Sequence, residues 1–146
     1  MKHYILPLLV AFATLCGCSN IVTSSDEYRE PHYNEVENMH IEWNDLFNQS
    51  QDNYYVYVYS VACTACSMLR EDMVKFAKKE GQHFYFIYPS DDITFTDDED
   101  VADASIGATS IENVNIYTTP TLMEITNKTV TYYSRDYYQI KALIEQ

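Results

Sequence analysis

The sequence predicts a single α/β domain in which helices flank a central mixed β-sheet. Residues 54–60 and 83–88 are rich in aromatic and β-branched residues and enclose a segment with helical periodicity, which is a β-α-β pattern. Such a unit joins two parallel strands by a right-handed crossover. Residues 122–126 and 129–133 have the spacing of an antiparallel hairpin, and a last helix follows them. The 146 residues suffice for one domain with one sizeable core.

Composition and charge exclude several classes of protein. The chain has only 3 Gly and 4 Pro, which argues against a long disordered or fibrous protein. A formal net charge of −13 at pH 7 argues against a nucleic-acid partner and against electrostatic docking on anionic lipid. The 14 Tyr suit half-exposed sheet positions, because the ring packs and the hydroxyl reaches water.

Residues 1–17 are expected to be a signal peptide of the lipoprotein type. Lys2 and His3 precede an apolar run over residues 5–15 that is too short to span a bilayer comfortably. The tetrapeptide Leu15-Cys16-Gly17-Cys18 resembles the lipobox of bacterial lipoproteins. This resemblance implies cleavage before Cys18 and attachment of lipid to Cys18. An ordinary cleaved signal peptide, with Cys18 incidental, and a retained membrane anchor are the alternatives.

The lipoprotein hypothesis predicts an extracytoplasmic chain held to the cell membrane by its lipid. Residues 18–33 are polar and are expected to form a flexible tether, followed by a folded domain over residues 34–146. In the mature chain only Cys63 and Cys66 remain as thiols. They would lie in a compartment where disulfides form and persist.

The domain is expected to begin with a helix capped by Asn34. Apolar residues recur at helical spacing over the next turns: Val36, Met39, Trp43, Leu46 and Phe47. Residues 49–53 are polar and predict a turn into the strand at 54–60.

Cys63-Thr64-Ala65-Cys66 lies where this strand gives way to a helix that is expected to reach about Glu80. Unpaired N–H groups and the helix dipole at the N-terminus favour a thiolate, so we expect the pKa of Cys63 to lie below its reference of about 8.5. Thiol–disulfide exchange needs one accessible thiolate to attack and a second thiol to resolve the mixed disulfide. Cys63 is therefore the expected nucleophile, and Cys66, one turn inside the helix, the expected resolving thiol.

Two other roles for the cysteine pair stay open. Cys63–Cys66 can be a structural disulfide in an adaptor without turnover. Metal binding is disfavoured, because zinc takes four ligands and the mature chain offers only His32, His40 and His83 besides the pair. Two thiolates can also bind copper(I). We expect no metal and no other cofactor.

Residues 90–110 form an acidic segment without an obvious role. Calcium loops place oxygen ligands at set offsets and usually contain a Gly at a sharp turn. Here residues 97–100 are consecutive acidic residues, and no Gly follows until Gly107. We expect a solvated loop and a short helix through Ala104 that Asp97 or Asp98 caps.

Thr119-Pro120-Thr121 precedes the first hairpin strand, where a Pro is permitted because its missing N–H falls outside the ladder. Ser134 or Asp136 is expected to cap the last helix. The apolar side of that helix would be formed by Tyr137, Ile140, Ala142, Leu143 and Ile144.

Taken together, the C-x-x-C after a strand, the downstream Thr119-Pro120-Thr121 and the order of elements resemble the thioredoxin-like superfamily over residues 34–146. The resemblance implies a three-layer fold and a cis-proline loop at Pro120. It also implies that Thr119 and Pro120 face the cysteines and bind an extended substrate strand through the backbone.

Three departures distinguish this chain from thioredoxins themselves. Ala62 stands where thioredoxins have Trp, and Thr64-Ala65 replaces their Gly-Pro. Tyr57 stands where they have a buried Asp that assists proton transfer. We therefore expect a divergent relative, similar to the small thioredoxin-like lipoproteins and bacteriocin transport accessory proteins of Gram-positive bacteria.

The resemblance implies an extracytoplasmic thiol–disulfide oxidoreductase on the outer face of a Gram-positive membrane. Its partners would be exported cysteine-containing proteins or a membrane redox partner. The alternative is a non-catalytic binding or accessory lipoprotein, such as a bacteriocin accessory protein, in which the disulfide is structural.

Overall fold

The computed structural model describes residues 32–90 and 92–146. The expected signal peptide, the lipidation of Cys18 and residues 18–31 of the expected tether lie outside the described residues. In chain order the elements are η1 (Tyr33–Met39), η2 (Trp43–Asp45), β1 (Asn53–Val58), α1 (Thr64–Ala77), β2 (Phe84–Ile87), α2 (Glu99–Asp103), η3 (Ile111–Asn113), β3 (Thr121–Thr126), β4 (Thr129–Ser134) and α3 (Tyr137–Ile144).

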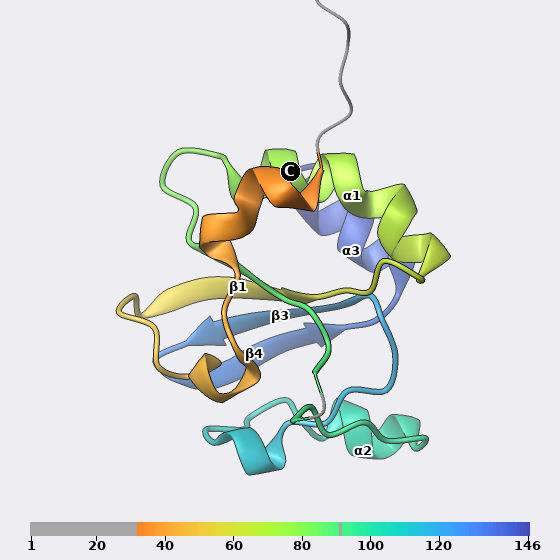
Figure 1. Cartoon of the computed structure of the whole chain (residues 1–146). Helices are drawn as coiled ribbons and strands as arrows, with labels where there is room; N and C mark the ends of the chain where they lie inside the picture. The colour runs from red at the N-terminus through yellow and green to blue at the C-terminus, as the bar shows by residue number, and fades with distance from the viewer. Residues whose placement is uncertain (1–31, 91) are drawn as a thin grey trace, which may run out of the picture.

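The four strands form one mixed sheet in the order β2-β1-β3-β4. β1 pairs with β2 in parallel, with Tyr57 opposite Phe86, and with β3 in antiparallel, with Tyr57 opposite Leu122. β3 and β4 form an antiparallel hairpin around Asn127 and Lys128, both of which have positive φ. α1, α3 and η1 cover one face of the sheet, and the segment with α2 covers the other (Figure 1). This confirms the predicted three-layer α/β fold with a mixed sheet.

Each face of the sheet has its own buried cluster, because successive side chains of a strand point to opposite faces. Tyr57 and Tyr59 lie on the side of α1 and α3, in a cluster with Cys66, Leu69 and other helix residues. Val56 and Val58 lie on the other side, in the cluster covered by residues 93–116. The central strand β1 is therefore buried on both faces, and its C-terminal end delivers the cysteine motif.

The predicted N-terminal helix over residues 34–47 is wrong. Two short 3-10 helices, η1 and η2, replace it, and the chain between them is extended, with His40 at φ −77° and ψ 137°. The reason is tertiary. The backbone of this segment pairs with the sheet edge at β2, where the N–H of Ile41 donates to the carbonyl of Phe86 at 2.9 Å. Residues that pair with a strand cannot keep helical dihedrals.

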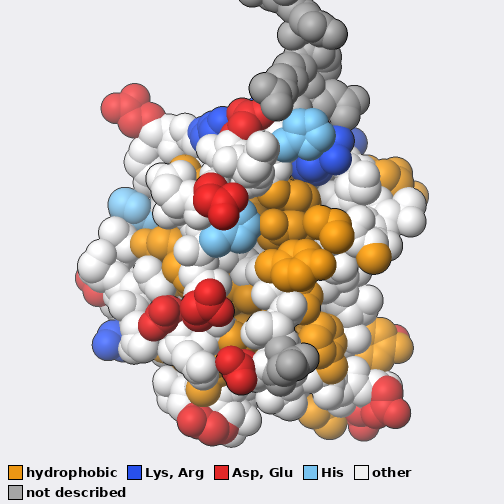
Figure 2. All heavy atoms as spheres, viewed as in Figure 1, with side chains coloured by type: hydrophobic (Ala, Val, Ile, Leu, Met, Phe, Trp, Pro, Cys, Tyr) orange, Lys and Arg blue, Asp and Glu red, His pale blue; other side chains and the backbone are white. Residues whose placement is uncertain are grey.

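The acidic segment forms a loop and the short helix α2, as predicted. The carboxylate of Asp98 caps the helix by accepting the N–H groups of Asp100 and Val101. Arg135, which follows β4, forms ion pairs with Glu99 and Asp103 and ties α2 to the hairpin. Figure 2 shows Asp and Glu side chains spread over the viewed face and hydrophobic side chains exposed among them.

The remaining elements agree with prediction to within a few residues. Asp136 caps α3 by accepting the N–H of Gln139 at 2.9 Å. Gly81, which follows α1, has a φ of +78°, a conformation that suits a glycine after a helix. Within residues 32–90 and 92–146, no helix has the length and apolar character needed to cross a bilayer.

Candidate functional site: the Cys63–Cys66 pair

Cys63 is the N-cap residue of α1 and stands at the end of a tight loop after β1. Its N–H donates to the carbonyl of Ser60 at 3.1 Å, and the Ser60 hydroxyl accepts the N–H of Ala62 at 3.2 Å. Its Sγ accepts the N–H of Cys66 at 3.0 Å, in the position that a Ser or Asp oxygen takes at other helix starts. The first turn of α1 therefore presents an N–H donor to the sulfur of Cys63.

The two cysteines form a disulfide, with Cα atoms 5.2 Å apart. They differ in accessibility: Cys63 is partly exposed, whereas Cys66 is fully buried in the cluster under α1. An incoming sulfur can therefore reach Cys63 but not Cys66. This asymmetry is the one that the sequence predicted for an attacking and a resolving thiol.

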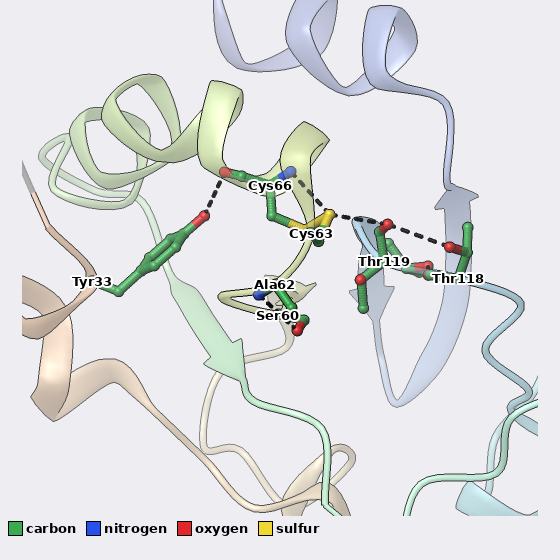
Figure 3. Close-up of a disulfide and its surroundings, with 8 residues drawn as sticks. Tyr33, Ser60, Ala62, Cys63, Cys66, Thr118 and Thr119 are labelled. Atoms are coloured by element: carbon green, nitrogen blue, oxygen red, sulfur yellow. Dashed lines mark hydrogen bonds between the residues drawn. A yellow bond between two sulfur atoms is a disulfide. The ribbon is translucent and has the colours of Figure 1, made fainter.

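The loop before β3 faces the cysteine pair (Figure 3). The Thr119–Pro120 peptide bond is cis, and the carbonyl oxygen of Thr119 lies 3.2 Å from Sγ of Cys63. The buried hydroxyl of Thr121 donates to the carbonyl of Thr118 at 2.7 Å and braces the loop. An open hollow of about 430 Å³ separates the two sides and is lined by Ser60, Ala62, Cys63, Thr64, Ala65, Thr118 and Thr119.

The structure thus brings together four of the five site residues expected from the sequence. Cys63 and Cys66 meet Thr119, which lies more than 50 residues further along the chain, and Pro120 follows Thr119 through the cis peptide bond. Thr119 contacts Cys63 through its backbone oxygen. Cys18 lies outside the described residues.

Sequence reasoning missed Tyr33, which it assigned to the end of the tether. The Tyr33 hydroxyl donates to the carbonyl of Cys66 at 3.0 Å (Figure 3). The ring of Tyr33 lies 3.9 Å from that of Tyr59, centroid to centroid. Burial raises the pKa of Tyr33 to about 12. One signal was available: a large apolar ring directly before an expected N-cap often packs against the first turn of its helix.

The sequence predicts that Tyr57 stands where thioredoxins have a buried Asp, and the side chain of Tyr57 is fully buried under α1. Among the described residues, the Tyr57 oxygen has no hydrogen-bond partner. Burial, and then the neighbouring Tyr33, raises the pKa of Tyr57 far above its ordinary value.

His40 stands at the edge of this aromatic group. Its Nδ1 lies 3.1 Å from the carbonyl of Val36 and its Nε2 lies 2.8 Å from the hydroxyl of Tyr59. A carbonyl only accepts, so Nδ1 carries the proton, and in the neutral ring Nε2 accepts from Tyr59. Within the part of the chain that the structure describes, no three His, Cys, Asp or Glu side chains are grouped so as to hold a metal ion.

Comparison with solved structures shows the same architecture. Thioredoxin f2 of Chlamydomonas reinhardtii superimposes with a TM-score of 0.50 at 17% identity, over 74% of this chain and 94% of that one. A putative oxidoreductase with a thioredoxin fold gives 0.47 at 14% identity, over 80% of this chain and 100% of the other. A mutant thioredoxin of Halobacterium salinarum gives 0.45 at 19% identity, over 73% of this chain and 87% of the other.

At these identities the comparison shows a shared fold and nothing more. The superposition on thioredoxin f2, with its TM-score of 0.50, is the one that supports this conclusion. Comparison of the sequence with models of known families and with curated proteins finds no match. The chain has the thioredoxin-like fold, with a C-x-x-C pair closed as a disulfide at the N-terminus of α1. This combination of fold and cysteine pair fits a thiol–disulfide oxidoreductase.

Proposed function

We propose that the protein is an extracytoplasmic, lipid-anchored thiol–disulfide oxidoreductase that exchanges disulfides with exported cysteine-containing proteins or with a membrane redox partner. The observation that carries the proposal is the asymmetry of the pair. Cys63 is partly exposed and receives an N–H donor from α1, whereas Cys66 is buried one turn further along.

The geometry supports exchange in either direction. In oxidation of a substrate, a substrate thiolate attacks Sγ of Cys63, and the sulfur of Cys66 leaves. A second substrate thiol then attacks the substrate sulfur of the mixed disulfide, and Cys63 leaves as a thiolate. In reduction, Cys63 attacks a substrate disulfide, and Cys66 then displaces the substrate sulfur. In both directions the Cys66 N–H, 3.0 Å from Sγ of Cys63, stabilises negative charge that develops on that sulfur.

The carbonyl of Thr119 supports substrate binding beside the pair. It lies 3.2 Å from Sγ of Cys63 and borders the open hollow. A substrate chain in extended form can donate a backbone N–H to this carbonyl, so that its own cysteine is held against Cys63. We assign substrate binding to the backbone of Thr119 and to Pro120, which fixes the loop.

The decisive experiment is a trap with the full-length chain carrying Cys66→Ala. Without a resolving thiol, the mixed disulfides formed by Cys63 should accumulate. They are detected as thiol-sensitive adducts by non-reducing electrophoresis and mass spectrometry. A chain that also carries Cys63→Ala is the matched control and should form none.

A second measurement separates this enzyme from a non-catalytic accessory protein with a structural disulfide. The Cys63–Cys66 pair is equilibrated with glutathione mixtures, and its reduction potential is determined. Absence of trapped adducts, with a potential too low to exchange with glutathione, would establish the accessory role instead. The reduction potential also indicates whether the protein oxidises, reduces or isomerises its partners.

The lipid anchor has its own test, because residues 1–31 lie outside the described structure. Cys18→Ala should abolish labelling by a fatty-acid probe and release the chain from the membrane fraction. Cys16→Ala is the matched control and should keep both. Unchanged labelling of the Cys18→Ala chain would refute the anchor without affecting the redox proposal.

A further inference from the structure

The first turn of α1 is braced by a side chain from outside the helix. The hydroxyl of Tyr33 donates to the carbonyl of Cys66 at 3.0 Å (Figure 3). Cys66 lies inside α1, where a carbonyl accepts the N–H four residues further along the helix. A carbonyl oxygen has two lone pairs, so the hydroxyl uses the second one. The helix does not need this contact to be complete, and the position of the contact beside the cysteine pair calls for a functional explanation.

Tyr33 is itself held against the sheet. Its ring lies 3.9 Å from that of Tyr59 and 5.8 Å from that of Phe86, centroid to centroid. Tyr59 is fixed in turn, because its N–H donates to the carbonyl of Ile87 at 3.1 Å. The Tyr33 hydroxyl therefore connects the main chain of Cys66 to the sheet rather than to another part of the helix.

The main chain of Cys66 acts directly on the reactive sulfur. Its N–H donates to Sγ of Cys63 at 3.0 Å. In the oxidised protein the disulfide also holds the two residues together, with their Cα atoms 5.2 Å apart. Reduction removes this covalent link, and the N–H donor then keeps its place only if the first turn of α1 keeps its own. A brace on Cys66 therefore matters more to the reduced protein than to the oxidised one.

We propose that Tyr33 is a positioning residue that holds the main chain of Cys66 so that its N–H stabilises the thiolate of Cys63 in the reduced protein. This inference rests on the proposed exchange function. A hydrogen bond to a charged sulfur is stronger than one to a neutral sulfur, so correct placement of the N–H favours the thiolate. A more stable thiolate makes the reduced protein more stable and its disulfide more oxidising.

Reduction of the pair by glutathione shows where this stabilisation enters. Two glutathione thiols supply two electrons, the Cys63–Cys66 bond breaks and glutathione disulfide forms. Of the two thiol protons, one goes to Cys66 and the other to solvent, so that Cys63 remains a thiolate. The equilibrium constant of this reaction therefore rises with the stability of that thiolate.

Other charged and titratable groups act on Tyr33 and on its neighbour Tyr59. They come from α1, from η1 and the residue after it, from β1 and from the end of β2: Arg70, Glu37, His40, Tyr57 and Tyr88. Tyr33→Phe leaves all of them in place and keeps the ring that stacks on Tyr59. Because Tyr33 is only half-buried, the variant should also fold, and any change at the cysteine pair reports the loss of the hydroxyl.

The test compares the reduced full-length chain with its Tyr33→Phe variant. Alkylation of Cys63 by iodoacetamide is measured at a series of pH values by mass spectrometry, so that this thiol is followed separately from the others. Tyr33→Phe should raise the measured pKa of Cys63, and its acid dissociation constant should become about threefold to tenfold smaller, because part of a charge-assisted hydrogen bond is lost. The equilibrium with glutathione at neutral pH should shift toward the disulfide.

A thermodynamic cycle separates positioning from a merely structural role. The free energy of unfolding of the oxidised and of the reduced protein is measured by urea titration, in the wild type and in Tyr33→Phe. The proposal predicts a larger loss of stability in the reduced protein. The difference between the two losses must match the change in the glutathione equilibrium constant, because the two measurements close one cycle. A merely structural contact would lower both stabilities equally.

Tyr55→Phe is the matched control. Tyr55 is a half-buried tyrosine of the same cluster, but its ring packs on Phe76 and Phe84. Phe76 belongs to the last turn of α1, at the other end of the helix from the cysteines. The control should therefore keep the wild-type pKa of Cys63 and the wild-type equilibrium with glutathione.

Four outcomes decide the matter. A wild-type pKa of Cys63 with a wild-type glutathione equilibrium in Tyr33→Phe would overturn the positioning role while the exchange function stands. Equal destabilisation of the oxidised and reduced forms would overturn it as well, and so would an equal shift in the Tyr55→Phe control. A wild-type pair that does not exchange with glutathione, in a chain whose Cys66→Ala variant traps no adducts, would instead overturn the exchange function itself.

Discussion

The carbonyl oxygen of Thr119 lies 3.2 Å from Sγ of Cys63, although the two residues are 56 positions apart in the sequence. The contact joins the loop before β3 to the N-terminus of α1 and forms one wall of the hollow at the cysteine pair. It uses the backbone of Thr119, which separates the role of this residue from the chemistry of its side chain.

Thr119→Val should therefore leave thiol exchange within about twofold of the wild-type rate, a difference of only about 0.4 kcal/mol in activation free energy. Valine keeps the branched shape and the carbonyl but removes the hydroxyl. The second-order rate of mixed-disulfide formation by the Cys66→Ala chain measures the effect. A large loss would show that the Thr119 hydroxyl, and not its carbonyl, serves the pair.

Thr121→Val should destabilise the loop that carries Thr119. The buried Thr121 hydroxyl donates to the carbonyl of Thr118 at 2.7 Å, and valine fills the same volume without that hydrogen bond. The free energy of unfolding, measured by urea titration, should fall by about 1 to 2 kcal/mol. Thr109→Val, at an exposed position, is the control and should change it by less than about 0.5 kcal/mol.

Tyr57→Phe should stabilise the protein. The variant removes a buried oxygen without a hydrogen-bond partner among the described residues and keeps the ring that packs on Phe86 and Tyr59. The free energy of unfolding should rise by about 1 kcal/mol at neutral pH. A decrease of similar size would mean that the hydroxyl makes a favourable hydrogen bond in solution.

Stability should decrease at alkaline pH because of two tyrosines, the half-buried Tyr33 and the fully buried Tyr57. Burial raises the pKa of Tyr33 to about 12 and that of Tyr57 further, whereas both would have ordinary values near 10 in the unfolded chain. Above about pH 10 the unfolded chain loses protons that the folded chain retains, so unfolding becomes more favourable as pH rises. The contribution of these two tyrosines to the free energy of unfolding is therefore complete below about pH 10 and is lost progressively toward pH 12.

Urea titrations at a series of alkaline pH values measure how steeply the free energy of unfolding falls with pH, which is the slope compared here. Tyr33→Phe should make it shallower by removing one of the groups that lose a proton on unfolding. Replacement of the exposed Tyr138 by Phe is the control, because it removes a hydroxyl that lies in water in the folded protein. An unchanged slope for Tyr33→Phe would show that Tyr33 is not buried in solution.

The strands and the two longer helices could be predicted because each is encoded locally. The alternation of β1 and β4, the apolar spacing of α1 and the capping residue Asp136 depend only on neighbours in sequence. The structure of the N-terminal segment could not be predicted in this way. Its apolar residues have helical spacing, but Ile41 pairs with Phe86 at the sheet edge, and this non-local backbone pairing overrides the local preference.

The same distinction between local patterns and long-range contacts applies to the candidate site. The sequence by itself determined the cysteine spacing, the placement of Cys63 at a helix start and the Thr-Pro-Thr loop, because these depend on contiguous residues. Only the tertiary structure decided that Tyr33 contacts the main chain of Cys66 and that the Tyr57 hydroxyl is buried under α1 without a hydrogen-bond partner among the described residues. Those contacts depend on how η1 and α1 pack over the central strand, and long-range packing of this kind leaves no periodic pattern in the sequence.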